Sequence, residues 1–167
     1  MTLTISMAGS MSSAVMIEIA SFGKFKSHSL KAAFEYYMTL ANKKIPTVHV
    51  TLKESRKPQE SEKIRAESLE LESSLDTAGR IPLLLDDSGE LMDSLEFSRF
   101  VNKLLNSGQH LRFHVGNFYG IPDPLKKRGI RMISLGPLTM NHELALVVLA
   151  EQIYRTGTLL FGGQYHR

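Results

Sequence analysis

Two glycine-containing loops in the last third of the sequence are the segments best suited to small-molecule chemistry. Gly116 to Gly120 and Leu135 to Met140 each follow a short apolar run. Glycine exposes backbone N–H and C=O groups, and Pro137 stiffens the second loop. Backbone groups held in this way can bind a flat heterocycle such as adenine. Taken alone, each loop is equally an ordinary connection after a strand.

Candidate proton-transfer groups lie near these loops and at the chain end. His142 follows Asn141, which together with Thr139 is a candidate N-cap for the next helix. A neutral imidazole at this place could accept a proton, or it could be a structural histidine near a cap. Tyr165 and His166 stand close to the C-terminus, where residues are normally frayed, so they need a docking surface to act.

Composition excludes several other chemistries. The 167 residues contain no cysteine, so disulfides and a cysteine nucleophile are ruled out, and a reducing compartment such as the cytoplasm fits. His110 and His114 have no acidic partner in a metal-binding pattern, so we predict no metal. No apolar run approaches the roughly 20 residues that span a bilayer, so no membrane partner is expected.

Charge is modest overall but unevenly distributed. The formal net charge is +3, and from Leu111 onward seven basic residues stand against three acidic ones. A basic C-terminal part suits a polyanion such as RNA. An ordinary solvated surface of a slightly basic protein is the other explanation.

The elements that must position these residues alternate along the chain. Residues 1–15 have no signal-peptide pattern, so we interpret them as an unassigned leader, either disordered or the product of an upstream start, and we expect 16–167 to form one domain. Gly89 supplies a flexible turn position after 81–85, and Gly157 closes the last helix. We predict strands at 17–21, 48–52, 81–85, 111–115 and 131–135, and helices at 30–43, 60–75, 93–105 and 143–156.

Strands alternating with helices predict an α/β fold with a mostly parallel, covered sheet. Ligands of such sheets bind beyond the carboxyl ends of strands, which here are Leu85, Val115 and Leu135. Within the charged helix 60–75, the expected apolar contacts are Ile64, Leu69, Leu71 and Leu75.

The last helix, 143–156, is apolar nearly all round, with Val147, Val148, Leu149 and Ile153 covering much of it. Such a helix is buried on several sides. We therefore predict a dimer, with a fully internal helix as the competing explanation.

The spacing of these motifs adds a resemblance. VGNFYG, SLGPLTMNHELA, LAEQIYR and YHR, in this order, are similar to IGGxxG, SLSxxTLPHxLA, LxEQLYRA and HPYHRE of the SPOUT-class methyltransferases that modify N3 of a pseudouridine in large-subunit ribosomal RNA. The similarity is dense from Leu111 to Arg167 and looser but continuous from Met16, through Gly23 and Lys24 and the segment LLLDDSGE.

The resemblance implies an S-adenosylmethionine site and a homodimer acting on the ribosome, with the C-terminal segment threaded through a trefoil knot. It implies catalytic or target-contacting roles for His142, Arg155, Tyr165 and His166, with Arg155 holding a phosphate or a developing negative oxygen. The cofactor residues that it implies are Leu85, Gly116, Gly120, Leu135, Gly136, Pro137, Leu138, Thr139 and Met140.

Four positions depart from the family pattern. Asn117 stands in place of the second glycine, Asn141 in place of proline, and Gly163 and Gln164 in place of His-Pro. Two alternatives therefore stand beside the ribosomal assignment. One is a methyltransferase for another RNA nucleoside, and the other is a non-catalytic member of the fold that binds RNA or the ribosome.

Overall fold

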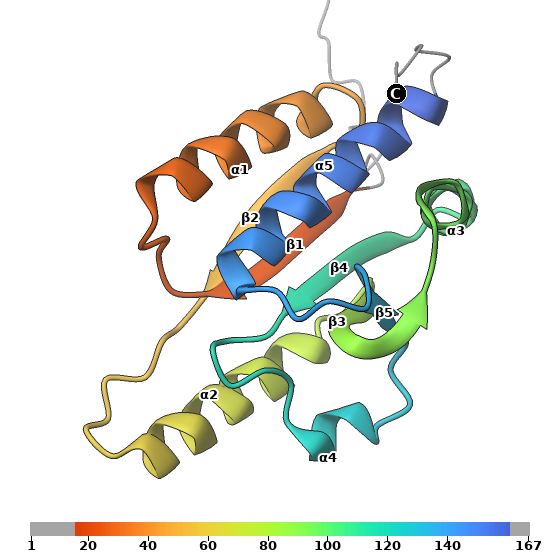
Figure 1. Ribbon diagram of the computed structural model, residues 1–167. Coiled ribbons are helices and arrows are strands. Elements are labelled where there is room, and N and C mark those ends of the chain that lie inside the picture. The colour runs from red at the N-terminus through yellow and green to blue at the C-terminus, as the bar shows by residue number, and fades with distance from the viewer. Residues whose placement is uncertain (1–15, 161–167) are drawn as a thin grey trace, which may run out of the picture.

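All neighbouring strands of the central sheet run parallel, in the order β2-β1-β4-β3-β5 (Figure 1). The computed structural model describes residues 16–160. The elements in chain order are β1 (Ile17–Phe22), α1 (His28–Asn42), β2 (Thr47–Leu52), α2 (Glu60–Leu75), β3 (Arg80–Leu91), α3 (Ser94–Asn106), β4 (His110–Val115), α4 (Asp123–Lys126), β5 (Met132–Ser134) and α5 (His142–Leu160).

One face of the sheet carries the larger apolar core. Successive side chains of a strand point to opposite faces, so Ile17 and Ile19 of β1 share a face. They belong to one buried cluster with Phe113 of β4, Phe34 of α1 and Leu149 of α5. Helices α1 and α5 lie side by side on this face, and α5 also packs against α3 (Figure 1).

The opposite face is covered by α2 and α4. Ala20 of β1 and Leu84 of β3 alternate with the first set and form a second cluster with Leu71 of α2 and Leu125 of α4. The sheet is therefore buried on both sides, as an all-parallel sheet must be. Because crossover connections join parallel strands, the carboxyl ends of the strands all point toward the same edge of the sheet.

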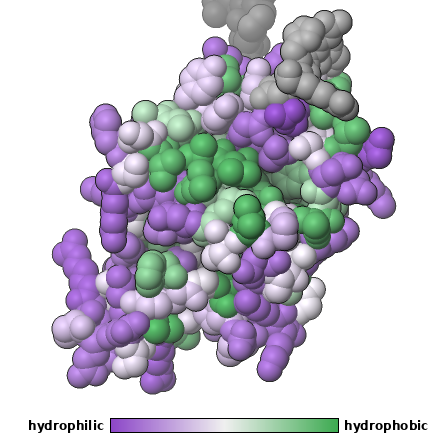
Figure 2. All heavy atoms as spheres, in the orientation of Figure 1, coloured by the Kyte–Doolittle hydropathy of each residue, from purple (hydrophilic) through white to green (hydrophobic). Residues whose placement is uncertain are grey.

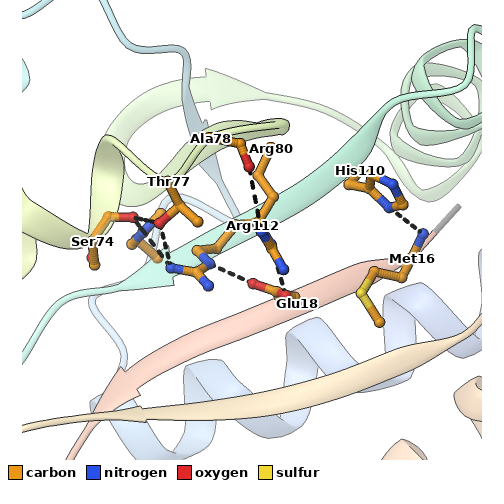
Figure 3. Close-up of polar contacts among 9 residues, drawn as sticks. Met16, Glu18, Ser74, Thr77, Ala78, Arg80, His110 and Arg112 are labelled. Carbon is orange, nitrogen blue, oxygen red and sulfur yellow. Dashed lines mark hydrogen bonds and ion pairs between the residues drawn. The ribbon is translucent and has the colours of Figure 1, made fainter. Parts of the chain in front are cut away.

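This second face also contains a buried ion cluster (Figure 3). Glu18 of β1 is 4% exposed and its carboxylate pairs with Arg80 of β3 at 2.7 Å and with Arg112 of β4 at 2.5 Å. The Arg112 guanidinium also donates to Thr77 Oγ1 at 2.8 Å, just beyond α2. A buried carboxylate needs such partners, and here they connect three strands to the end of one helix.

Most elements agree with the sequence prediction. Helix α2 has the predicted bounds, and α3 begins with the predicted capping box, in which Asp93 accepts from the Glu96 N–H and Glu96 accepts from the Asp93 N–H. The run 81–85 is a buried strand, with Leu83, Leu84 and Leu85 all less than 9% exposed. The five strands and the parallel α/β class are confirmed.

Gly89 was predicted to supply a flexible turn position, and this prediction was wrong. Strand β3 continues to Leu91, and its register with β5 shifts between Leu85 and Glu90, both of which pair with Ile133. Gly89 does not have a positive φ. A Cβ at Gly89 would lie 2.6 Å from the Ile133 backbone nitrogen, so close strand approach requires glycine here.

Gly157 does not close α5, which continues to Leu160. A Cβ at Gly157 would lie 2.5 Å from Cβ of Lys44, in the connection between α1 and β2. Glycine at this position lets the helix approach that connection, so packing and not helix termination explains it.

Helix α2 differs from its predicted contact face. Leu69 is 58% exposed, whereas Glu67 is 2% exposed and therefore inside. A buried carboxylate needs hydrogen-bond partners, and Glu67 accepts from the Ser55 N–H and from Asn117 Nδ2. Among residues 16–160, the structure contains no helix with the length and hydropathy of a membrane span.

Candidate functional site

A cavity of about 570 Å³ opens at the carboxyl ends of β4 and β5 and beside Leu85, Asp86 and Asp87 in the middle of β3. It also reaches the start of α5 and one residue of α4. The predicted strand ends therefore meet, as parallel strands require. The lining residues are Leu85, Asp86, Asp87, Val115, Gly116, Asn117, Phe118, Tyr119, Gly120, Ile121, Lys126, Leu135, Gly136, Leu138, Thr139, Met140, Asn141, His142 and Ala145.

Eight of the nine residues expected to hold the cofactor line this cavity, and His142 lines it with them. Pro137 belongs to the same loop but is not among the lining residues. The sequence prediction did not single out Asp86, Lys126, Phe118 or Tyr119. Asp86 follows a predicted strand end directly, which was a usable signal, whereas the approach of α4 to the cavity left no trace in the pattern.

The loop after β4 is closed by two glycines with different roles. A Cβ at Gly116 would lie 2.8 Å from the Gly120 carbonyl carbon, so the loop ends could not approach one another with a side chain there. Gly120 has φ +79°, a left-handed conformation that glycine adopts readily. The Gly120 N–H donates to the Asn117 carbonyl at 3.0 Å, which completes a tight turn beside the cavity.

The loop after β5 is fixed by polar contacts of its own. Ser134 Oγ donates to the Gly136 carbonyl at 2.9 Å and accepts from the Gly136 N–H at 3.2 Å. Asn141 caps α5, because its Oδ1 accepts from the Glu143 N–H at 2.8 Å and its carbonyl accepts from the Ala145 N–H. The predicted cap is thus Asn141, and half-buried His142 begins the helix at the cavity wall.

The cavity also contains an ion pair. Lys126 Nζ lies 2.8 Å from Asp86 Oδ2, and the Ser88 N–H and hydroxyl donate to Asp86 Oδ1. Burial by itself raises the pKa of the Asp86 carboxyl, but the bonds from Lys126 and Ser88 outweigh it and hold that pKa below its usual value. The hydrogen bond to Asp86 raises the pKa of Lys126. Asp86 is therefore an ionised carboxylate at neutral pH.

A family model described as a predicted SPOUT methyltransferase matches residues 15–166. The chain belongs to the SPOUT methyltransferase family. This membership implies the trefoil knot predicted from the resemblance, and it makes the chain a methyltransferase that takes its methyl group from a donor cofactor.

Individual relatives of this SPOUT methyltransferase agree. A protein of Pelobacter propionicus named ribosomal RNA large subunit methyltransferase H is 34% identical over 145 residues, covering 86% of this chain and 94% of the relative. A protein of the same name from Thermosipho melanesiensis is 36% identical over 155 residues, covering 90% and 98%. The solved structure of a probable methylase family protein from Haemophilus influenzae matches the fold with a TM-score of 0.53 at 11% identity, over 92% of this chain and 71% of that one.

Asn117, the departure from the SPOUT glycine pattern, is part of the loop structure. Its Oδ1 accepts from the Tyr119 N–H at 2.9 Å, and its Nδ2 donates to the carboxylate of buried Glu67 on α2. Its φ is not positive, so the position requires no glycine. The side chain therefore has partners on the turn and on α2, and the turn keeps its shape without the family glycine.

Arg155, which the SPOUT resemblance also implies for the site, does not line the cavity. Arg155 lies thirteen positions after His142 on α5, about 20 Å along the axis at 1.5 Å per residue. Its guanidinium contacts Glu151 Oε1 at 2.6 Å and 3.1 Å. Tyr165 and His166 lie outside the described residues, as do residues 1–15. One copy of residues 16–160 thus brings His142, but not Arg155, to the cavity.

The described part of this SPOUT chain has no metal-binding cluster but does have a second cavity. Within residues 16–160 there is no group of three His, Asp or Glu side chains that could hold a metal ion. A second cavity of about 640 Å³ lies between α1 and β2, where Lys24, Phe25 and His49 are among its lining residues. None of the predicted site residues that fall within 16–160 lines it.

Proposed function

We propose that this chain is an S-adenosylmethionine-dependent methyltransferase that methylates N3 of a pseudouridine in large-subunit ribosomal RNA. The observation that carries the proposal is the cavity at the strand ends, where eight of the nine expected cofactor residues meet. The names of the relatives support ribosomal RNA as the substrate class. Such a substrate places the enzyme with ribosomes in the cytoplasm.

The cavity fits this cofactor in size, shape and charge. A volume of about 570 Å³ is within the range of small-molecule sites. The space next to the Cα of Gly120 is open, so a flat ligand can approach the backbone at that position. Lys126 pairs with Asp86, so Asp87 leaves one more carboxylate than ammonium group among the lining residues, which favours a cationic ligand. When bound, S-adenosylmethionine supplies a methyl group made electrophilic by its positive sulfur.

The chain must orient the target base and remove a proton. N3 of pseudouridine is an imide nitrogen, so the N3–H bond breaks as the new N3–methyl bond forms, and a base accepts the proton. We propose that His142, Tyr165 and His166 contact the base or accept this proton. Arg155 stabilises the negative charge that develops on a neighbouring oxygen. Holding the two reactants in line supplies much of the remaining rate enhancement.

A homodimer is required if Arg155 acts with His142. In one copy the two residues are about 20 Å apart along α5, so Arg155 would have to come from a second copy. Leu144 and Leu159 of α5 are 41% and 40% exposed, and apolar spheres gather over the middle of the face on which α1 and α5 lie (Figure 2). We therefore propose that α5 contributes to a dimer interface.

The assignment is tested with methyl-labelled S-adenosylmethionine. Purified protein is supplied with unmethylated ribosomes, free ribosomal RNA and tRNA, and the labelled nucleoside is identified after digestion. We expect label on a pseudouridine of the large subunit. Label on tRNA alone would contradict the ribosomal substrate. Calorimetry that detects no binding at millimolar S-adenosylmethionine would support the non-catalytic alternative.

The cofactor site has its own test. A methyl group at Gly116 would meet the Gly120 backbone, so Gly116→Ala should weaken S-adenosylmethionine binding at least tenfold by calorimetry. Ser73→Ala, at an exposed position of α2, is the control and should bind like the wild type. Unchanged affinity in Gly116→Ala would place the cofactor elsewhere.

A further inference from the structure

Two aromatic or apolar side chains stand out on the rim of the strand-end cavity. Among residues 16–160, Phe118 at 85% and Leu138 at 76% are the most exposed large hydrophobic residues. They belong to the two different loops that line this one cavity, and Tyr119 beside Phe118 is 39% exposed. Scattered exposed apolar residues are ordinary, but this coincidence marks the cavity mouth as an apolar surface.

The turn that carries Phe118 is held by hydrogen bonds between the residue before Phe118 and the two residues after it. The Tyr119 N–H donates to Asn117 Oδ1 at 2.9 Å, and the Gly120 N–H donates to the Asn117 carbonyl at 3.0 Å. Asn117 and Gly120 also form an isolated antiparallel bridge. The exposed ring is therefore attached to a fixed backbone, which lowers the entropy lost when a ligand binds it.

A buried carboxylate fixes this turn to the body of the protein. Glu67 of α2 is 2% exposed, and one of its oxygens accepts from Asn117 Nδ2. The other oxygen accepts from the Ser55 N–H at 3.0 Å and lies 3.8 Å from Lys63 Nζ. Most charged residues of α2 face solvent, and Glu67 is buried because its carboxylate holds this turn in place.

We propose that Phe118 is a stacking platform for a nucleobase of the RNA strand whose target base enters the cavity. Flat, exposed aromatic rings bind unstacked RNA bases by their faces, and they do so for any base. The Phe118 and Tyr119 rings meet nearly at right angles, 5.5 Å apart, so Tyr119 supports the platform from its side. Glu67 is the positioning residue that acts through Asn117. The inference rests on the proposed function for its RNA substrate.

The main experiment compares Phe118→Ala with wild type by three measurements. These are KM for unmethylated ribosomes, the dissociation constant for S-adenosylmethionine, and quenching of a short single-stranded RNA that carries 2-aminopurine. We expect KM to rise roughly 5- to 100-fold, as loss of one stacked base predicts, with cofactor affinity within twofold of wild type. Quenching should be lost in Phe118→Ala and restored in Phe118→Trp.

Tyr36→Ala is the matched control. Tyr36 is an exposed aromatic residue of α1, 60% exposed, whose ring meets that of its neighbour Tyr37 edge to face, as Phe118 meets Tyr119, but it does not line the cavity. It should leave all three measurements unchanged. A loss of cofactor affinity equal to the rise in KM would assign the ring to adenine and overturn the proposal. Dimer dissociation in sedimentation by Phe118→Ala alone would assign it to the interface, and no change in any measurement would also overturn it.

The two proposals can fail separately. If wild-type protein methylates no ribosomal RNA, the proposed function fails, yet quenching of the 2-aminopurine RNA still tests the platform. If ribosomes are methylated and Phe118→Ala has wild-type KM and quenching, only the platform fails.

Glu67→Gln tests the brace. We expect a rise in KM for ribosomes with nearly unchanged kcat, and no additional rise when Glu67→Gln is combined with Phe118→Ala. A role of Glu67 in general stability alone predicts effects that multiply in the double variant, which would contradict positioning.

Discussion

Glu143 connects the cavity to a loop more than a hundred residues earlier in the chain. It follows His142 in α5 and is 4% exposed. Its two carboxylate oxygens accept from the N–H groups of Lys26, at 2.6 Å, and Ser27, at 3.1 Å. The loop between β1 and α1 is thereby fixed to the start of the helix that carries His142.

Glu143→Gln should lower the free energy of unfolding by about 1 to 3 kcal/mol, because the amide NH₂ group would face an N–H donor in place of an acceptor. Urea denaturation measures the change. Glu35→Gln is the control, since among the described residues Glu35 pairs only with Lys31, on the exposed surface of α1, and its replacement should shift stability by less than about 0.5 kcal/mol. Equal effects of the two substitutions would contradict a specific role for the Glu143 contacts.

At the same residue scale, the sequence indicated which loops line the cavity but not the side-chain contacts that hold these loops in place. Gly116, Leu135 and their neighbours were found because strand ends and glycine loops follow local rules. The buried role of Glu67 could not be found, because its partner Asn117 lies fifty positions away. A carboxylate on a charged helix looks solvated until the tertiary contacts are known.

At the scale of elements, α5 lies between two other helices on the larger apolar face of the sheet. It packs against both α1 and α3. Gly157 lets it approach the α1–β2 connection, where a Cβ would lie 2.5 Å from that of Lys44. The helix is thus placed by a close contact in its interior, and its pattern from Glu143 to Thr156 predicted its existence but not its end.

Gly157→Ala separates the two explanations for this glycine by the sign of its effect. Intrinsic helix propensity alone would stabilise the protein by about 1 kcal/mol. Close packing predicts the opposite, a loss of about 1 to 3 kcal/mol, because the added methyl forces α5 and the connection apart. Chemical denaturation decides, and a stabilised variant would show that the contact yields at little cost.

The other differences between predicted and observed elements have similar causes. Helix 60–75 and the capping box at Asp93 were predictable because capping and periodicity are local. The extension of β3 to Leu91 and the short helix α4 depend on pairing with β5 and on packing against the sheet. Tertiary contacts, which single-sequence patterns do not contain, fixed both.

At the scale of the whole molecule, the two faces of the sheet differ in kind. The face covered by α1, α3 and α5 has the larger apolar cluster, whereas the α2 face buries Glu18 and His114 and half-buries Arg112 among its apolar residues. Alternation along β4 puts Arg112 and His114 on the face opposite Leu111 and Phe113. It could not predict that Arg112 and His114 would be covered by the end of α2.

This polar interior makes stability depend on pH through His114, which is fully buried with its Nε2 3.2 Å from the Ser74 carbonyl oxygen. Burial lowers the pKa of His114 to about 4 from its usual 6.5. In the unfolded chain, His114 therefore binds a proton below about pH 6.5, whereas in the folded protein it binds that proton only below about pH 4. The contribution of His114 to the free energy of unfolding is complete above pH 6.5 and falls by about 3 kcal/mol as the pH drops to 4.

The free energy of unfolding, measured by urea denaturation between pH 7 and pH 4, should therefore decrease as the pH falls, and His114→Gln should reduce this pH dependence. A slope that is the same in both proteins would show that His114 does not carry the pH dependence.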